Sequence, residues 1–105
     1  MKQKYTSGIG DFLRGLRTQH EKTLHEVSRA TDIDSPLISK IERGERLPTL
    51  DQVKKFAKYY RVSEKDLTIK LTAARIIREY GFTDTTYDAI SLVKEQIVLY
   101  NKRKK

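Results

Sequence analysis

Apolar residues recur every three or four positions along most of the chain, which is the spacing of an amphipathic helix and not of a strand. The pattern predicts a first helix over residues 9–20, two short helices within 23–44, and a fourth helix over 49–60. Thr49 and Gln52 form a capping box at the start of the fourth helix, and Leu50 is expected to face inward from it. Ser63 can cap a short fifth helix. The fold class expected from this pattern is therefore all-α.

Residues 23–44 read as two short helices joined by a tight turn. Thr23, with a glutamate three residues later, forms a capping box for the first of them. The second begins at Asp34 or Ser35, which are both good caps, and ends at Gly44, which supplies a left-handed residue. The stretch therefore predicts a helix-turn-helix unit.

The second short helix has an apolar side and a polar side. Ile38 and Ile41 form the stripe that we expect to be buried. The outer face is left with small polar and basic residues, namely Ser35, Pro36, Ser39, Lys40 and Arg43. A short helix that is held by its apolar side and shows such groups outward suits a DNA major groove.

The sequence ISKIERG at residues 38–44, followed by Pro48, resembles the helix-turn-helix of the phage repressor and Cro-like family, also called the xenobiotic-response-element family. The resemblance runs from about Ile9 to Leu67. It implies a five-helix, lambda-repressor-like DNA-binding domain over residues 9–67. It also implies that the outer residues of the second short helix meet DNA bases. These are Ser35, Pro36, Ser39, Lys40 and Arg43, and Lys40 is the strongest candidate for guanine.

The same resemblance implies further contacts with phosphate and one structural ion pair. The expected phosphate contacts are Lys22, Thr23, Leu24 and Arg46, around the start of a helix whose dipole attracts anions. Arg17 and Glu42 match a pair that ties the first helix to the recognition helix in this family. Glu21 and Lys22 depart from the family pattern, which has glycine and then an apolar residue there. Because a residue other than glycine is strained in the left-handed region, we expect the loop to take a different path here.

Residues 68–100 predict two more helices with wide apolar faces. One runs from Leu67 to Tyr80, as a separate helix or an extension of the fifth, and the last begins at Asp84 or Thr85. The two helices are expected to form a helical hairpin. The faces that a hairpin leaves open must pack on the first domain or on a second subunit. We favour a homodimer, through Leu71, Ile76, Ile90, Val93, Ile97 and Tyr100.

The net charge is +8, from 22 Lys and Arg against 14 Asp and Glu, which favours nucleic acid as a partner. Residues 1–8 read as a flexible basic arm, and residues 101–105, NKRKK, as a disordered, solvated tail. The chain has no cysteine and no apolar run of membrane-spanning length. We therefore expect a cytoplasmic protein that does not contact a membrane.

Catalytic and cofactor motifs are not found. There is no glycine-rich phosphate loop, no metal-ligand spacing and no serine in a nucleophile context. The sequence therefore predicts no enzyme, no cofactor and no metal site. The expected function is that of a transcriptional regulator, a repressor, that binds specific sequences of double-stranded DNA as a homodimer on an inverted repeat. The alternative is an antitoxin-like module whose last two helices bind and neutralise a partner protein.

Overall fold

The computed structural model describes residues 8–104, and over this range it contains six α-helices and no strand. They are α1 (Ile9–Gln19), α2 (Leu24–Thr31), α3 (Ser35–Glu42), α4 (Leu50–Tyr60), α5 (Glu64–Tyr80) and α6 (Asp84–Lys104). The all-α fold class is confirmed. Residues 1–7 of the expected basic arm lie outside the described residues. The chain divides into two compact units between Arg75 and Ile76.

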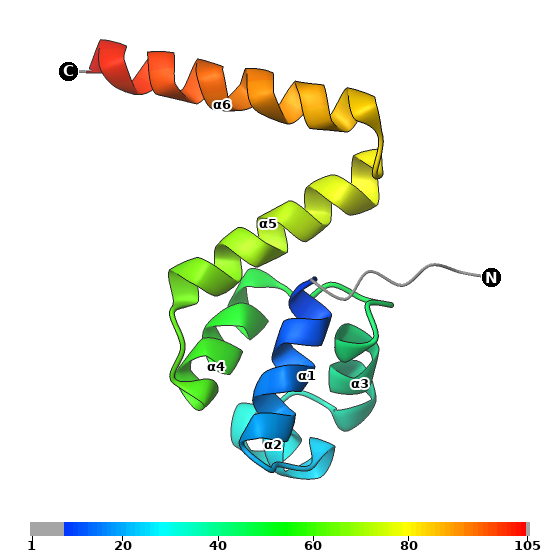
Figure 1. Cartoon of the computed structure of the whole chain (residues 1–105). Helices are drawn as coiled ribbons and strands as arrows, with labels where there is room; N and C mark the ends of the chain where they lie inside the picture. Colours follow the sequence, from blue (N-terminus) through cyan, green and yellow to red (C-terminus); the bar gives the residue numbers. More distant parts are fainter. Residues whose placement is uncertain (1–7, 105) are drawn as a thin grey trace. The chain divides into compact units, whose positions relative to one another are not determined.

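The first unit is built around α1. This helix packs against α3 and α4, and α2 also contacts both of them. Figure 1 shows α1, in blue, between α3 and α4. Their apolar faces meet in one cluster that loses almost all contact with solvent, which is the main source of stability for such short helices. The cluster consists of Ile9, Leu13, Leu16, Val27, Ile33, Ile38, Ile41, Val53, Phe56, Ala57, Tyr60, Leu67 and Leu71.

Capping boxes fix the starts of α2 and α4. The Thr23 hydroxyl accepts from the Glu26 N–H at 3.0 Å, and the Glu26 carboxylate accepts from the Thr23 N–H at 2.8 Å. Thr49 and Gln52 form the same reciprocal pair at the start of α4. A side-chain cap stabilises a helix by about 1 kcal/mol, so these pairs set where the short helices begin. Both boxes agree with the expectation from the sequence.

Among residues 8–104, three residues other than glycine adopt left-handed backbone conformations, which are Glu21, Asp32 and Arg61. Each follows the last turn of a helix. Glu21 has φ 56°, and its N–H donates to the Thr18 carbonyl while the next N–H donates to the Arg17 carbonyl. A different loop path was expected here, and the structure instead shows Glu21 in the left-handed conformation. Hydrogen bonds to the otherwise unpaired carbonyls offset the conformational cost.

α5 is one continuous helix, so the segment from Leu67 to Tyr80 extends the fifth helix and does not form a separate one. Leu67 and Leu71 are buried in the core cluster of the first unit. The assignment of Leu71 to a dimer surface was therefore wrong. Its spacing from Leu67 is that of one helical turn, which places both side chains on the buried face. Ile76 is half-buried and remains a candidate.

The turn between α5 and α6 is held by side-chain hydrogen bonds. Gly81 has φ 85°, a conformation that suits glycine, and its N–H donates to the Ile77 carbonyl. The Thr83 hydroxyl accepts from the Thr86 N–H at 3.1 Å, so Thr83 caps α6 in place of the expected Asp84 or Thr85. The buried Thr86 hydroxyl donates to the Tyr80 carbonyl at 3.1 Å. These bonds define the connection closely.

α6 is exposed from Tyr87 to its end. The expected helical hairpin stays a prediction. The helix also continues to Lys104, past the end expected near Tyr100. Residues 101–104 of the expected disordered tail are thus helical, and only Lys105 lies outside the described residues. Basic side chains in a last turn stabilise it by interacting with the helix dipole, which favours the longer helix.

Candidate nucleic-acid interface

α3 has one buried side and one outward side. Ile38 and Ile41 are each 1% exposed, and Glu42 beside them is 6% exposed. On the outward side, Pro36 and Lys40 are exposed. Ser35 and Ser39 are half-buried at its edge, and Arg43 is exposed just after the last turn. The five expected base-contact residues therefore follow the exposed and partly exposed surface of α3, and its buried side holds the helix on the core.

An ion pair anchors the end of α3 to α1. Arg17 donates to both carboxylate oxygens of Glu42, from Nε at 2.8 Å and from Nη2 at 3.0 Å. Its Nη1 also donates to the Lys22 carbonyl at 3.0 Å. The hydrogen bond with Glu42 raises the pKa of Arg17 against the opposing effect of burial. Because the Glu42 side chain is buried, loss of Arg17 would leave a carboxylate without its counter-ion, which is strongly destabilising.

Gly10 allows α1 to lie directly against the end of α3. A Cβ atom added at this residue would collide with the Ile41 carbonyl oxygen and lie 2.9 Å from the Glu42 carbonyl oxygen. Only a residue without a side chain fits this contact. Gly10 was not among the predicted site residues, although a glycine inside a helical pattern is a signal of close backbone approach. Together with Arg17, it fixes how far α3 stands from the core.

The end of α3 holds Arg43 in a defined position. The Gly44 N–H donates to the Ile41 carbonyl, and the Glu45 N–H donates to the Lys40 carbonyl, in a Schellman arrangement. Arg43 donates to Glu45 from Nε at 2.8 Å and also to the Ser39 hydroxyl. The bond with Glu45 raises the pKa of Arg43. Two of the expected base contacts are therefore joined to each other before any DNA is bound.

The expected phosphate site lies at the start of α2. Lys22 and Arg46 are exposed, but the Thr23 N–H is not available to phosphate because it donates to Glu26. The phosphate contact expected at Thr23 therefore cannot come from its N–H, since the capping box uses that donor. The pKa of Glu26 is lowered chiefly by this hydrogen bond, so its carboxylate is charged at neutral pH. The Leu24 N–H remains at the first turn of the helix, next to the positive charge of Lys22.

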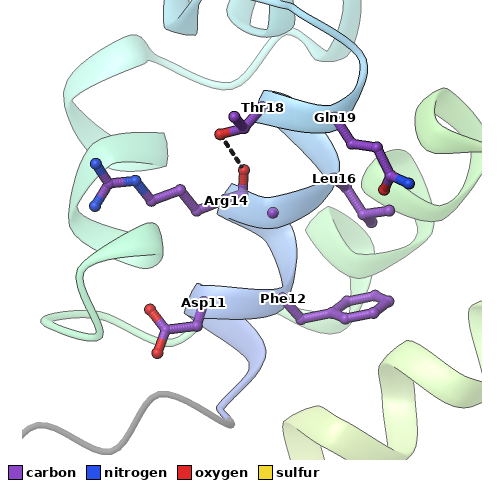
Figure 2. A pocket seen from close by; sticks show the side chains of 7 residues that line it. Asp11, Phe12, Arg14, Leu16, Thr18 and Gln19 are labelled. Atoms are coloured by element: carbon purple, nitrogen blue, oxygen red, sulfur yellow. Dashed lines mark hydrogen bonds between the residues drawn. The ribbon is translucent and has the colours of Figure 1, made fainter.

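A shallow groove runs along the outer side of α1 (Figure 2). Figure 2 shows the Thr18 hydroxyl donating to the Arg14 carbonyl, a bond of 2.9 Å. That hydroxyl is thereby occupied by a hydrogen bond within its own helix. The lining residues are Asp11, Phe12, Arg14, Gly15, Leu16, Thr18 and Gln19.

Residues 8–104 contain neither a metal-binding cluster nor a membrane-spanning helix. No group of three or more His, Cys, Asp or Glu side chains within this range is placed to hold a metal ion. None of the six helices described has both the length and the apolar character needed to cross a bilayer.

Comparison with known proteins gives matches to one kind of protein. Residues 9–68 match the family model described as a helix-turn-helix domain. Two curated proteins from two strains of Mycobacterium tuberculosis, both named uncharacterized HTH-type transcriptional regulators, are 30% identical to the chain over 95 residues. Each match covers 86% of this chain and 66% of the relative, so the chain spans just under two thirds of the length of these proteins. No solved structure matches significantly.

The family match and the geometry concern the same residues. The matched segment contains α1 to α4 and the start of α5, and within it α2 and α3 form the two short helices of the motif. The turn between them passes through the left-handed Asp32, and Ile33 after it is buried in the core. Since the model covers more than half of the chain, this protein belongs to the helix-turn-helix domain family.

Proposed function

We propose that the protein is a transcriptional regulator that binds specific sequences of double-stranded DNA. The observation that carries this proposal is the division of α3 into a buried, anchored side and an outward side with Lys40 and small polar groups. A helix presented in this way fits the major groove, where base edges differ. The family match and the names of the two relatives support it. The subfamily that we propose is the phage repressor and Cro-like one, on the ISKIERG segment.

Lys40 is the proposed reader of guanine, because its exposed ammonium can donate to O6 and N7. Pro36 can offer only an apolar contact, such as one with a thymine methyl group. Ser35 and Ser39 are short hydroxyl donors at the edge of the same surface. Arg43 can contact DNA only if it gives up its hydrogen bonds to Glu45, because Glu45 accepts them in the free chain. We propose these five residues as the base-contacting set.

Phosphate contacts are proposed at Lys22, Leu24, Thr23 and Arg46. Lys22 and Arg46 supply positive charge, and Leu24 supplies an N–H at the start of α2. Thr23 contributes by placing this helix start, through its capping box, and not through its own N–H. Such contacts position a protein on the duplex without reading sequence.

We further propose that the protein acts as a homodimer on an inverted repeat, as a repressor in the cytoplasm. The support for a dimer is the exposed apolar surface of α6, which a single chain leaves in contact with water. Two copies of such a domain read half-sites about one helical turn, or roughly 34 Å, apart. A dimer that covers a promoter would block polymerase by occupying the site.

Selection from a random duplex pool at two salt concentrations tests the proposal. Enrichment of an inverted repeat that survives the higher salt supports a site-specific dimer. Equal loss from all sequences, with a steep dependence on salt, would show phosphate contact alone and would overturn the proposal.

Lys40→Ala tests the readout directly. We expect a loss of about 1–3 kcal/mol in binding the selected sequence and a relaxed preference at one base step. Lys58→Ala is the matched control, because it removes the same charge from an exposed position of α4. It should change only the salt-dependent part of the binding free energy. An equal loss on all sequences in Lys40→Ala would make Lys40 a phosphate contact.

A second candidate function rests on the same exposed face of α6. An antitoxin-like protein would use that face to bind and neutralise another protein. It predicts that the purified chain alone stays monomeric and that the face is covered only by a different protein. A stable dimer of the purified chain would argue against this candidate.

A further inference from the structure

Exposed basic side chains lie at the end of α3 and in the turn after it, and a carboxylate lies among them. The basic residues are Lys40, Arg43 and Arg46, and the carboxylate is that of Glu45. Glu42 is buried and paired with α1, so within residues 40–46 Glu45 is the exposed acidic group. A carboxylate at this place opposes the approach of phosphate, because like charges repel. The charge of Glu45 on its own therefore weakens the proposed DNA surface.

The backbone fixes where Glu45 stands. Gly44 has φ 78°, a left-handed conformation that reverses the chain after α3. The Glu45 N–H donates to the Lys40 carbonyl at 2.9 Å, and the Gly44 N–H donates to the Ile41 carbonyl at 3.1 Å. These bonds return residue 45 to the last turn of the helix without any contribution from its side chain. The side chain can therefore be changed while the backbone of the turn is kept.

Glu45 accepts two hydrogen bonds from one edge of the Arg43 guanidinium. Nε donates to Oε2 at 2.8 Å, and Nη2 donates to Oε1 at 3.3 Å. Nη1 donates to the Ser39 hydroxyl. A guanidinium edge of this kind also fits the O6 and N7 atoms of guanine and the oxygens of a phosphate. The carboxylate of Glu45 therefore occupies donors that Arg43 would use on DNA.

The pair is exposed, so it can open in water at a small cost. The Arg43 side chain is 45% exposed and that of Glu45 is 54% exposed. An exposed ion pair shifts an equilibrium by up to about fivefold. The pair of Arg17 with Glu42 differs, because the Glu42 side chain is 5% exposed and would lose its counter-ion in a buried place. Arg43 can therefore exchange its partner, whereas Arg17 cannot.

We propose that Glu45 competes with DNA for the guanidinium of Arg43, and that this competition limits the affinity of the protein for DNA. Arg43 leaves Glu45 where the DNA offers an acceptor pair whose gain exceeds the cost of opening the ion pair. Elsewhere it stays with Glu45, and the pair brings no net charge to the phosphates. The inference rests on the proposed DNA contact of Arg43 and adds the residue that limits this contact.

Two other roles of Glu45 would give different results in a binding measurement. If Glu45 only repels phosphate, its removal strengthens binding by the same factor whether or not Arg43 is present. If Glu45 stays with Arg43 on DNA and orients it toward a base, its removal weakens binding, because a preorganised donor is lost. Competition instead predicts a gain in affinity that is larger when Arg43 is present.

A double-mutant cycle on Arg43 and Glu45 separates these roles. The wild type, Glu45→Gln, Arg43→Ala and the double variant are titrated at one salt concentration into labelled duplexes, and binding is followed by fluorescence anisotropy. One duplex has random sequence and the other carries the sequence enriched by selection. Gln keeps the size of Glu but cannot form the charged contact with two hydrogen bonds.

We expect Glu45→Gln to bind both duplexes more tightly than the wild type. The gain should be up to about fivefold larger than the gain from the same change in Arg43→Ala, because only the chain with Arg43 is spared the opening of the ion pair. Equal gains in the two backgrounds would reduce Glu45 to a source of repulsion and overturn the proposal. Weaker binding of Glu45→Gln would show that Glu45 orients Arg43 on DNA, which also contradicts competition.

Glu64→Gln is the control, because it makes the same change at an exposed position in the first turn of α5. Its effect on binding should be the same with and without Arg43, as for independent sites. Coupling to Arg43 as strong as that of Glu45→Gln would show that the coupling does not come from the ion pair, and would overturn the proposal.

The free protein provides a measurement that does not involve DNA. In proton–nitrogen NMR spectra, the Nε–H of Arg43 should exchange with water more slowly in the wild type than in Glu45→Gln, because Glu45 accepts its hydrogen bond. Equal exchange rates would mean that the pair does not hold Arg43 in solution, and the proposal would fail. The backbone amide signals of each variant show that it is folded, as expected for changes of exposed side chains.

The titrations also separate this inference from the proposed function. A larger gain in the presence of Arg43 on random sequence, with no sequence enriched by selection, would leave the competition standing and overturn specific recognition. An enriched sequence with equal gains in both backgrounds would leave recognition standing and overturn the competition. Failure of Glu45→Gln to bind either duplex would overturn both.

Discussion

At the scale of single residues, Tyr60 combines a well-packed ring with a buried polar end. The side chain is 2% exposed, and its ring lies 4.9 Å from that of Tyr59 and 6.3 Å from that of Phe56. Its hydroxyl has no hydrogen-bond partner among the described residues. Burial, and then the charge of Glu42, raise the pKa of Tyr60. The hydroxyl is thus held neutral in a place where ionisation is costly.

Tyr60→Phe should therefore change the alkaline limb of stability. A folded-state pKa above the unfolded value of about 10 means that stability is complete below pH 10 and falls as the pH rises above it. The loss approaches about 1.4 kcal/mol per pH unit in that window. In the Tyr60→Phe variant, the free energy of unfolding should fall less steeply as the pH rises above about 10. At pH 7 the variant should be as stable as the wild type or more stable. Denaturant unfolding between pH 7 and 11 measures both.

The control is Tyr87→Phe, which changes an exposed tyrosine and keeps Tyr60, so it should retain the alkaline loss. An unchanged slope in Tyr60→Phe would show that other groups cause it. A large loss of stability at pH 7 would show that the hydroxyl makes a favourable contact after all.

Residue types predict local structure well where the rule depends on neighbours in sequence. Thr23 and Thr49 form the expected capping boxes, and Ile38 and Ile41 are buried as expected. Leu50 was expected to face inward but is 51% exposed, because periodicity cannot tell which side of a first turn the rest of the chain will cover. Such outcomes depend on tertiary packing.

At the scale of elements, two glycines of α1 differ in what lies beside them. Gly10 meets the backbone at the end of α3, whereas nothing lies within 4 Å of a Cβ added at Gly15. Both glycines lie inside the same helix, so they share its intrinsic preference for alanine over glycine. They differ in whether a methyl group added at the position has space.

Gly10→Ala and Gly15→Ala should therefore move stability in opposite directions. We expect Gly10→Ala to cost about 1–3 kcal/mol, as overpacking does, and to weaken DNA binding because α3 is displaced. Gly15→Ala should stabilise the protein by roughly 0.5–1 kcal/mol. Thermal unfolding of the two variants provides the comparison. Equal shifts of the same sign would mean that the close approach at Gly10 does not hold α3 in place.

The sequence predicts the number and type of the helices more reliably than their lengths. The continuity of α5 was left open, because Leu67 can begin a helix as well as continue one. The end of α6 was placed too early, since the basic residues 101–105 lack the apolar period that marks a helix. Leu71 was assigned to the wrong surface for a related reason. Periodicity identifies an apolar face but does not identify what covers it.

At the scale of the whole molecule, the two units differ in how they gain stability. The first unit has a core that includes residues from α1 to α5. In the second unit, from Ile76 to the end of the described residues, Thr86 alone is classed as buried. On the proposed homodimer, α6 gains by association the burial that the single chain does not give it. Its helical content should follow the concentration of the protein.

Dilution should reveal this difference. We expect far-ultraviolet circular dichroism per residue to weaken between high and low micromolar concentration, as paired α6 separates and frays. The tyrosine signal of the first unit should remain. Ile97→Glu, which places a charge within the exposed apolar surface of α6, should show the weaker helical signal at every concentration. A constant signal in the wild type, equal to that of Ile97→Glu, would mean that α6 is helical without a partner.

The separation of α3 into two sides has a consequence for how such a protein changes over generations. Ile38, Ile41 and Glu42 carry the folding contacts, whereas Lys40 and Ser35 carry few. Surface substitutions away from such contacts change stability by about 0.5 kcal/mol or less. Many substitutions of the outward side chains should therefore leave the fold intact. On the proposed function, a duplicated copy of this chain can change its target DNA sequence step by step while each intermediate variant still folds.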